Sequence, residues 1–250
     1  MRRTACWLLL LALGVTRAAG QQNLTEDSSA PNALLTWHDP VPWQAGLVYA
    51  RLSRPVELEG AEWKLRGHLA DVTVGVAPWA WLLLYGQAGV SDARLDNAIH
   101  HEFDYGAGGL AGARVNLWQI YEGVARTSWR VTVALAGEYA FRTTDDGGAG
   151  EIEWSETRCM LPIDYHLTFA RSFRNFYMGE FHSLAVYAGP AWSKLDGTWT
   201  RGDLQQDFEE SQALGIVGGV ELWLLENLSF GARADWFDGT SAQLTVRYRF

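Results

Sequence analysis

Cysteine is scarce in this chain, and long apolar runs are few. The two cysteines are Cys6 and Cys159. Cys6 lies in an N-terminal apolar stretch that we expect to be removed on export. The mature chain would then keep Cys159 alone, which excludes an intramolecular disulfide. Downstream of that stretch, no segment has the roughly 20 consecutive apolar residues that a transmembrane helix needs.

Positive charge is also in short supply. Lysine occurs only at Lys64 and Lys194, and 20 basic residues stand against 29 acidic ones, a formal net charge of −9. Loss of Arg2, Arg3 and Arg17 with the leader lowers the basic count from 20 to 17 and the net charge from −9 to −12. Nucleic-acid binding needs clustered cations that neutralise phosphates, so we expect no nucleic-acid partner.

The first 42 residues carry an export signal and a linker. Two arginines follow Met1, an apolar stretch covers residues 5–15, and small residues occupy positions 18–20. This order is typical of a secretory signal peptide, which we predict over residues 1–20. Residues 21–42 contain three prolines and no strand pattern. We predict that they form a flexible periplasmic extension before a domain over residues 43–250.

Alternation of polar and apolar residues dominates the remainder of the chain. Between residues 242 and 250 every second residue is apolar, and the residues between them are polar. Side chains alternate between the two faces of a strand, so this segment predicts one apolar and one polar face. The same alternation recurs upstream in segments of about ten residues. That is the length a tilted strand needs to cross a bilayer.

These segments indicate about ten strands, with eight or twelve as alternatives. They cover residues 44–54, 62–76, 80–94, 104–120, 128–142, 150–170, 181–195, 208–223, 228–238 and 241–250. Alternation is broken in the first two. We predict an all-β fold, an antiparallel up-and-down transmembrane β-barrel with both termini on the periplasmic side. Longer connections, such as residues 196–207, are predicted to be outer loops.

Aromatic residues fall mainly at the ends of the predicted strands. Amphipathic rings prefer the headgroup level, so this placement predicts two girdles. The periplasmic girdle comprises Trp43, Trp81, Trp129, Phe169, Phe181, Tyr248 and Phe250, and the outer girdle comprises Trp63, Phe141, Trp154, Trp192 and Trp236. Trp118 and Trp223 are expected to face inward.

The polar faces of the strands mix charges of both signs with small residues. Since small barrels are filled by their own side chains, we predict that these charges pair inside the lumen. The predicted network consists of Arg114, Arg130, Glu138, Asp164, His166, Glu221, Arg233, Asp235, Arg247 and Arg249. A selectivity lining for a narrow pore, with an anion preference, is the alternative role.

Three segments of the chain resemble those of a known family. They are a glycine-rich segment over 106–115, a small-residue segment over 185–191 and the closing hairpin over 228–250. They resemble the small bacterial outer-membrane β-barrel superfamily, typified by the OmpA, OmpX and OmpW barrels. Tyr248 and Phe250 resemble the terminal signal that the barrel assembly machinery recognises. The resemblance implies a multi-pass β-barrel in the bacterial outer membrane. Its implied partners are outer-membrane lipid and lipopolysaccharide, the assembly machinery and periplasmic chaperones.

The predicted outer loops are acidic, which raises the question of a metal site. The carboxylates are Glu57, Glu59, Glu62, Asp92, Asp96, Glu102, Asp104, Asp145, Asp146, Asp203 and Asp207. Such clusters can bind calcium or magnesium. No loop has the spacing of an EF-hand, so we expect no metal and no cofactor. Divalent bridging to lipopolysaccharide phosphates stays open.

Two histidine motifs raise the alternative of an outer-rim hydrolase. His100 and His101 lie in an acidic segment, as in outer-membrane proteases of the omptin type. His182 and Ser183 have the residue types of a lipid deacylase, but neighbours on a strand point to opposite faces. We expect no enzymatic activity and a structural envelope role with at most a narrow pore. A small-solute porin is the second alternative. A soluble ligand-binding barrel would need polar outward faces and an apolar lumen.

Overall fold

The computed structural model describes residues 43–95, 105–124, 127–145, 150–169, 182–225 and 227–250. The predicted signal peptide and the extension over residues 21–42 lie outside these ranges. All regular secondary structure in the described ranges is β-strand. Within them, no helix offers the length and apolarity that crossing a membrane requires.

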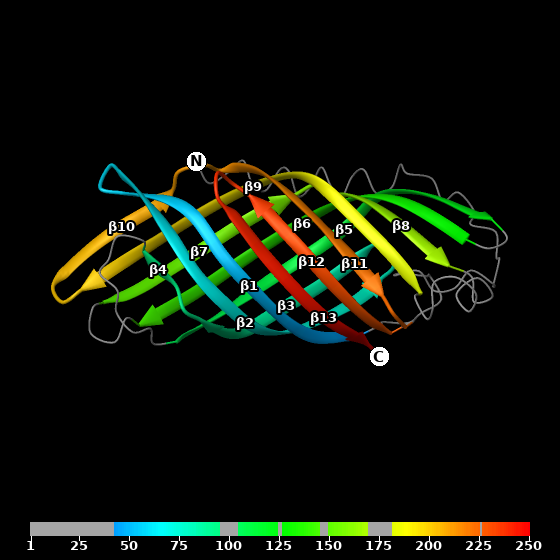
Figure 1. Ribbon diagram of the computed structural model, residues 1–250, viewed down its shortest axis with the longest axis horizontal. Coiled ribbons are helices and arrows are strands. Elements are labelled where there is room, and N and C mark those ends of the chain that lie inside the picture. Colours follow the sequence, from blue (N-terminus) through cyan, green and yellow to red (C-terminus); the bar gives the residue numbers. More distant parts are fainter. Residues whose placement is uncertain (1–42, 96–104, 125–126, 146–149, 170–181, 226) are drawn as a thin grey trace.

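In the described ranges, thirteen antiparallel strands make up the wall of the molecule (Figure 1). In chain order they are β1 (Trp43–Leu58), β2 (Ala61–Trp79), β3 (Leu82–Ser91), β4 (Arg94–Leu95), β5 (Gly106–Val124), β6 (Thr127–Asp145), β7 (Glu151–Met160), β8 (Ile163–Phe169), β9 (Ser183–Arg201), β10 (Leu204–Glu210), β11 (Leu214–Trp223), β12 (Leu228–Trp236) and β13 (Thr240–Arg249). β3 and β4 both pair with β2, β7 and β8 both pair with β6 and β9, and β10 and β11 both pair with β9. Each of these three couples occupies one position around the wall. The result is a closed, ten-stranded antiparallel barrel, which confirms the predicted fold class.

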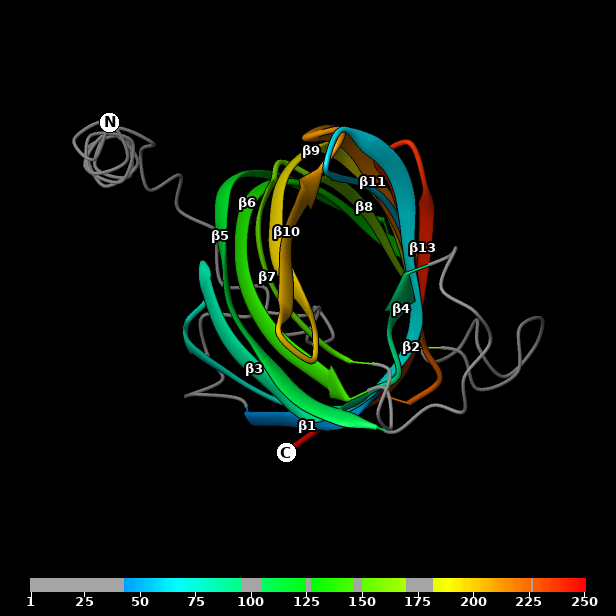
Figure 2. The ribbon, with the colours of Figure 1, turned by 90° about the vertical axis from the view of Figure 1, so that its left-hand side faces the viewer.

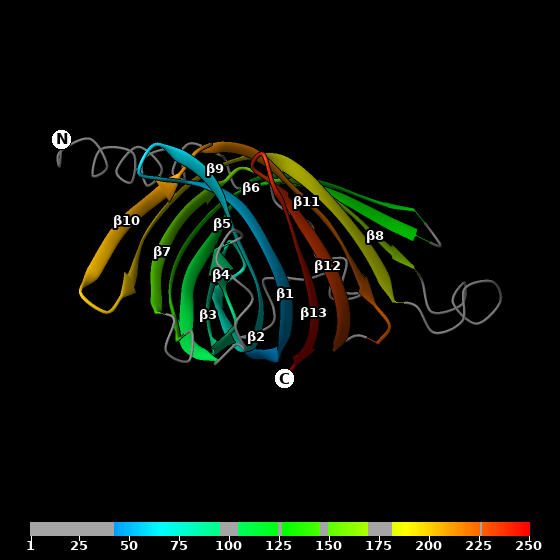
Figure 3. The ribbon, with the colours of Figure 1, turned by 60° about the vertical axis from the view of Figure 1, so that its left-hand side comes forward.

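The barrel closes between its first and last strands. β1 pairs with β13 from Gln44 to Arg51, and the backbone N–H of Phe250 donates to the carbonyl of Trp43 at 2.8 Å. Figure 2 shows the strands arranged as a ring, and Figure 3 shows β1 beside β13. We call the end where Trp43 and Phe250 meet the termini end, and the opposite end the distal end.

Two-residue turns join two of the hairpins at the distal end. Glu59 and Gly60 connect β1 to β2 with φ of 51° and 78°, and Gly202, with φ of 57°, begins the turn between β9 and β10. Left-handed residues in such turns match the twist of the flanking strands. The predicted outer loop over residues 196–207 is therefore wrong. β9 continues to Arg201 and β10 returns from Leu204, because Gly202 allows the chain to reverse within two residues.

β2 shows how the polarity of the wall changes along the barrel. Toward the termini end its outward side chains are apolar, with Val72 55% and Val74 47% exposed, while the inward Asp71 is buried. Toward the distal end the inward Leu65 is fully buried and the outward Lys64 is exposed. We call the part with the apolar outer face the belt half, and the part with the polar outer face the distal cap.

The distal cap is filled by an apolar core. Its buried members are Leu52, Val56, Leu58, Leu65, Ala93, Leu95, Ile152, Trp154, Leu195 and Phe208, with Trp63, Leu69 and Trp199 packed against them. This inside-apolar packing is that of a water-soluble barrel. It explains why alternation is broken in the first two predicted strands: apolar residues of β1 and β2 move from the outer face to the inner face partway along each strand.

Three tryptophans do not face as predicted. Trp63 and Trp154, predicted for the outer girdle, belong to the core of the distal cap. Trp118, predicted to face inward, is 52% exposed. A bulge between Asn116 and Trp118 adds one residue to β5 and sets Trp118 opposite the outward-facing Val133 of β6. Sequence alternation alone does not reveal such a bulge.

Candidate functional site: the lumen

A polar cavity of about 220 Å³ occupies the lumen of the belt half. Nine of the ten residues predicted for the lumen network line it: Arg114, Arg130, Glu138, Asp164, His166, Glu221, Arg233, Arg247 and Arg249. The tenth, Asp235, lines an adjacent cavity of about 50 Å³ that Glu138 also lines. All ten occupy the polar face of their strands, and in the belt half this face points into the lumen.

The centre of the lumen holds a cluster of ion pairs around Glu138. Its carboxylate lies 3.1 Å from Nη1 of Arg233 and 3.3 Å from Nε of Arg158, and it accepts a hydrogen bond from the Tyr85 hydroxyl at 2.7 Å. Arg158 and Arg233 also each approach Asp235 at 2.8 Å. Two arginines thus share two carboxylates from three strands, β6, β7 and β12. Such sharing offsets the cost of burying the charges.

A second buried cluster surrounds Arg54 at the level where the distal cap begins. Its Nη2 atom lies 2.9 Å from Glu156, 2.7 Å from Glu210 and 2.6 Å from the Ser193 hydroxyl. The guanidinium group also covers the ring of Phe237 at 3.9 Å. β12 and β13 form a short hairpin, and beyond it β1 changes partner from β13 to β10. Arg54 therefore ties β1 to β7, β9, β10 and the turn of that hairpin where the wall narrows.

A third buried pair joins β2 to β6. Arg142 donates to both carboxylate oxygens of Asp71, at 3.0 Å and 2.5 Å. The predicted lumen network did not include this pair, nor Arg54, Arg158, Glu156 and Glu210. Arg158 and Arg142 stood at inward positions of regular strands, so alternation could have found them. Arg54 and Asp71 lie in strands whose alternation is broken.

The part of the cavity nearest the termini end is richer in cations. Arg114 pairs with Asp164 at 2.5 Å, and Arg247 pairs with Glu221 at 3.2 Å. Arg130 lies 3.4 Å from Nδ1 of His166. Five arginines but only three carboxylates line the 220 Å³ cavity, so its lining carries an excess of positive charge.

The distal side of this cavity is blocked by side chains of the described residues. The ion pairs of Arg54, Glu138 and Arg142 follow it first, and the apolar core of the distal cap follows them. A hydrated solute would have to displace both layers to pass. The cavity is therefore a polar chamber beneath an apolar plug.

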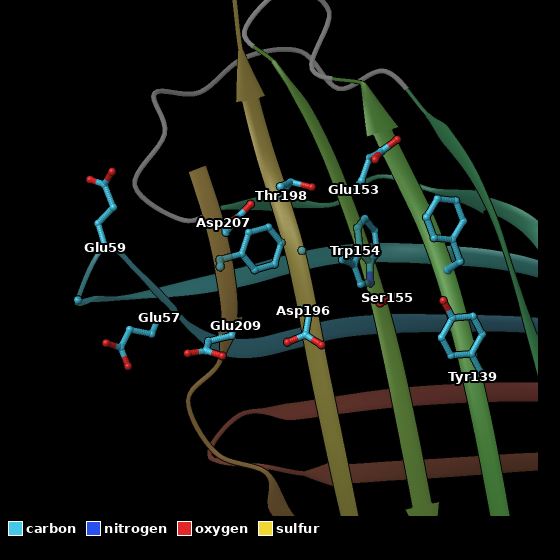
Figure 4. Close-up of a pocket in the computed structure, with 14 residues that line it drawn as sticks. Glu57, Glu59, Tyr139, Glu153, Trp154, Ser155, Asp196, Thr198, Asp207 and Glu209 are labelled. Atoms are coloured by element: carbon cyan, nitrogen blue, oxygen red, sulfur yellow. The ribbon is translucent and has the colours of Figure 1, made fainter. Parts of the chain in front are cut away.

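The outer wall of the distal cap carries an acidic groove of about 720 Å³ (Figure 4). Its carboxylates are Glu57, Glu59, Glu153, Asp196, Asp207 and Glu209. In the ranges that the structure describes, no three His, Cys, Asp or Glu side chains are grouped to hold a metal ion. Of the other loop carboxylates, Asp92 accepts hydrogen bonds from His68, and Asp96, Glu102, Asp104 and Asp146 lie outside the described residues.

The structure describes one of the two histidine motifs of the hydrolase alternative. His100 and His101 lie outside the described residues. His182 and Ser183 are 2% and 1% exposed and lie where β9 begins, at the termini end. An outer-rim enzyme would need its reactive groups accessible at the distal end.

Comparison with known proteins gives distant likenesses in structure. No protein-family model matches the sequence, and no curated protein sequence matches it. The structure is similar to the translocator domain of the autotransporter NalP from Neisseria meningitidis, with a TM-score of 0.36, 11% identity, and coverage of 98% of this chain and 96% of that chain. It is also similar to a triple mutant of the Rh. blastica porin, with a TM-score of 0.16, 8% identity, and coverage of 84% and 100%. The assignment of this chain as a closed antiparallel barrel accordingly rests on its own strand pairing.

Proposed function

We propose that this protein is a bacterial outer-membrane β-barrel with a structural role in the envelope and without enzymatic activity. The belt half would span the bilayer, and the distal cap would project on the far side from the termini. The single observation that carries the proposal is the reversal of polarity along the wall. A lipid environment favours apolar side chains outside and paired charges inside, whereas water favours the opposite.

Aromatic side chains near both edges of the belt half support this orientation. Tyr49, Trp192 and Trp236 are exposed toward the distal cap, and Trp43, Tyr248 and Phe250 are exposed at the termini end. Rings of this kind favour the level of lipid headgroups. The narrower membership in the OmpA, OmpX and OmpW superfamily is part of the same proposal, as is folding by the assembly machinery with periplasmic chaperones.

The blocked lumen favours a barrel that does not conduct. We expect the protein reconstituted in a planar bilayer at 1 M KCl to produce no stepwise current above the leak of the lipid. Heat-modifiable gel mobility of the same sample establishes that the inserted protein is folded. Stepwise currents with a preference for anions would instead support the porin alternative, because five arginines line the chamber.

The terminal aromatic residues supply a test of the proposed route into the membrane. Tyr248 and Phe250 lie on the outer face, and their rings meet edge to face at 5.2 Å. We expect Phe250→Ser to lower the amount of protein in the outer-membrane fraction severalfold, while refolding into detergent in vitro stays unchanged. Phe141→Ser, which removes another outward aromatic residue, is the matched control. Equal amounts of both variants in that fraction would contradict a signalling role for Phe250.

A further inference from the structure

A cluster of basic side chains lies on one side of the outer wall. Arg51 of β1, Lys64 and Arg66 of β2, and Arg94 of β4 face outward, and His68 of β2 accompanies them. We call these five residues the basic patch. The chain has only 20 basic residues in all, so four arginines and lysines on three neighbouring strands form an unusual concentration.

The strand register places the basic patch directly along the edge of the apolar belt. Arg51 lies opposite His68, and one outward position closer to the termini end Tyr49 lies opposite Ala70. Ala70 in turn lies opposite the exposed Val90 of β3. β1 and β2 therefore change from apolar to polar outward side chains at the same level, and β3 ends there, at Ser91.

Contacts within the basic patch connect it to the belt and hold two cations side by side. The ring of His68 stacks on that of Tyr49, with centroids 6.0 Å apart and planes at 12°. Asp92 accepts hydrogen bonds from the His68 backbone and, at 3.2 Å, from its ring. Arg66 lies directly opposite Arg94 in the sheet. Side chains of directly opposite residues in a sheet lie close together, so one anionic group can contact both guanidinium groups.

Along β7 and β9, the described residues at the edge of the belt form no such concentration of basic side chains. Just distal of the exposed Trp192, β9 carries Lys194, whose ammonium group pairs with Asp196 at 2.8 Å. The outward residues of β7 at this part of the wall are Thr157, Ser155 and Glu153. Positive charge at the edge of the belt is therefore one-sided.

We propose that the basic patch binds the phosphate groups of anionic lipid headgroups at the distal edge of the membrane. The inference rests on the proposed function, since it requires the belt half to stand in a bilayer. Basic residues next to a hydrocarbon layer attract anionic headgroups. Guanidinium groups bind phosphate oxygens in a bidentate manner, and three of the five residues are arginines. The headgroups would thus fix the height and the orientation of the barrel in its membrane.

The test compares two variants with the same change of charge. Arg66→Gln/Arg94→Gln removes the facing pair, and Lys194→Gln/Arg201→Gln removes two exposed cations of β9. The mature full-length chain is folded in a zwitterionic detergent at 50 mM salt. Binding of lipid A, which carries two phosphates, and of phosphatidylcholine is then measured by native mass spectrometry. Inorganic phosphate is titrated separately.

We expect the wild type and the β9 variant to prefer lipid A over phosphatidylcholine, and the facing-pair variant to bind lipid A roughly 10-fold more weakly. Addition of salt should reduce the preference of the wild type. The proposal is overturned if both variants lose the same affinity, if neither loses any, or if inorganic phosphate displaces lipid A completely at millimolar concentration. Insertion of all three proteins into phosphatidylcholine vesicles, monitored by heat-modifiable mobility, is independent of the patch. Failure of the wild type to insert would count against the membrane barrel itself.

Discussion

Replacement of Arg54 by methionine should lower the free energy of unfolding by about 3–5 kcal/mol. Arg54 is 1% exposed and contacts Glu156 and Glu210. Without Arg54, Glu210 loses this cation and Glu156 keeps its contact with Arg158 at 3.4 Å. The substitution preserves most of the apolar stem, so the effect comes mainly from the weaker compensation of the buried carboxylates. Urea unfolding in phosphatidylcholine vesicles, which lack anionic headgroups, measures it through heat-modifiable mobility.

Arg51→Met is the matched control for this prediction. Arg51 lies three residues earlier on the same strand, but its side chain is outward and exposed. We expect its replacement to change the free energy of unfolding by no more than about 0.5 kcal/mol. If the two variants unfold at the same urea concentration, the Arg54 cluster does not hold the narrowed part of the barrel together.

Introduction of an arginine at Val72 should cost about 1–3 kcal/mol in a bilayer, because a charge on the lipid-facing wall within the hydrocarbon layer is poorly solvated. Val72 is 55% exposed on the belt half, where its neighbour across the ladder is the 64% exposed Leu47. The same substitution should cost much less in detergent micelles, in which water reaches the wall more easily. Unfolding titrations in vesicles and in micelles provide the two values.

Thr157→Arg is the control that separates the belt half from the distal cap. Thr157 is outward and exposed on β7, between Glu156 and Arg158, which face inward. If the distal cap stands in water, an arginine at this position should change the free energy of unfolding by about 0.5 kcal/mol or less. Similar losses at Val72 and Thr157 would contradict the proposed position of the bilayer.

The buried ion pairs at the centre of the lumen help to close the polar chamber on its distal side. Glu138, Arg158, Arg233 and Asp235 bridge β6, β7 and β12 across the lumen. Each charge has at least two opposite neighbours, so removal of a single member leaves another charge underpaired. This arrangement resists the entry of water and solutes better than isolated charges would. A structural role for the barrel is consistent with such a network.

Several features of the fold were predictable from alternation alone. The closing segment over residues 242–250 became β13, and its apolar residues Leu244 and Val246 are exposed on the outer face. The inward positions of the lumen network followed from the same alternation. Residues two positions apart on a strand share a face, so one polar residue predicts that the next residue but one also points inward. The number of alternating segments indicated the number of barrel positions.

Other features depended on contacts between distant parts of the chain. The short hairpin of β12 and β13 lets β10 reach β1, and only this meeting buries Arg54 against Glu210. The bulge before Trp118 reverses the faces of β5 beyond it. The alternation of residues predicts neither the meeting of β10 with β1 nor the bulge in β5. Both depend on the register of a strand against its neighbour.

By itself, the sequence determined that each strand has two chemically different faces, and hence that the wall is a sheet with one polar and one apolar side. Only the tertiary structure decided which side is enclosed, and it decided differently for the two parts of the barrel. The physical reason is that alternation separates faces but does not specify the surrounding medium. In the belt half the charges meet one another inside, and in the distal cap Leu65, Trp154 and Phe208 exclude water from the centre.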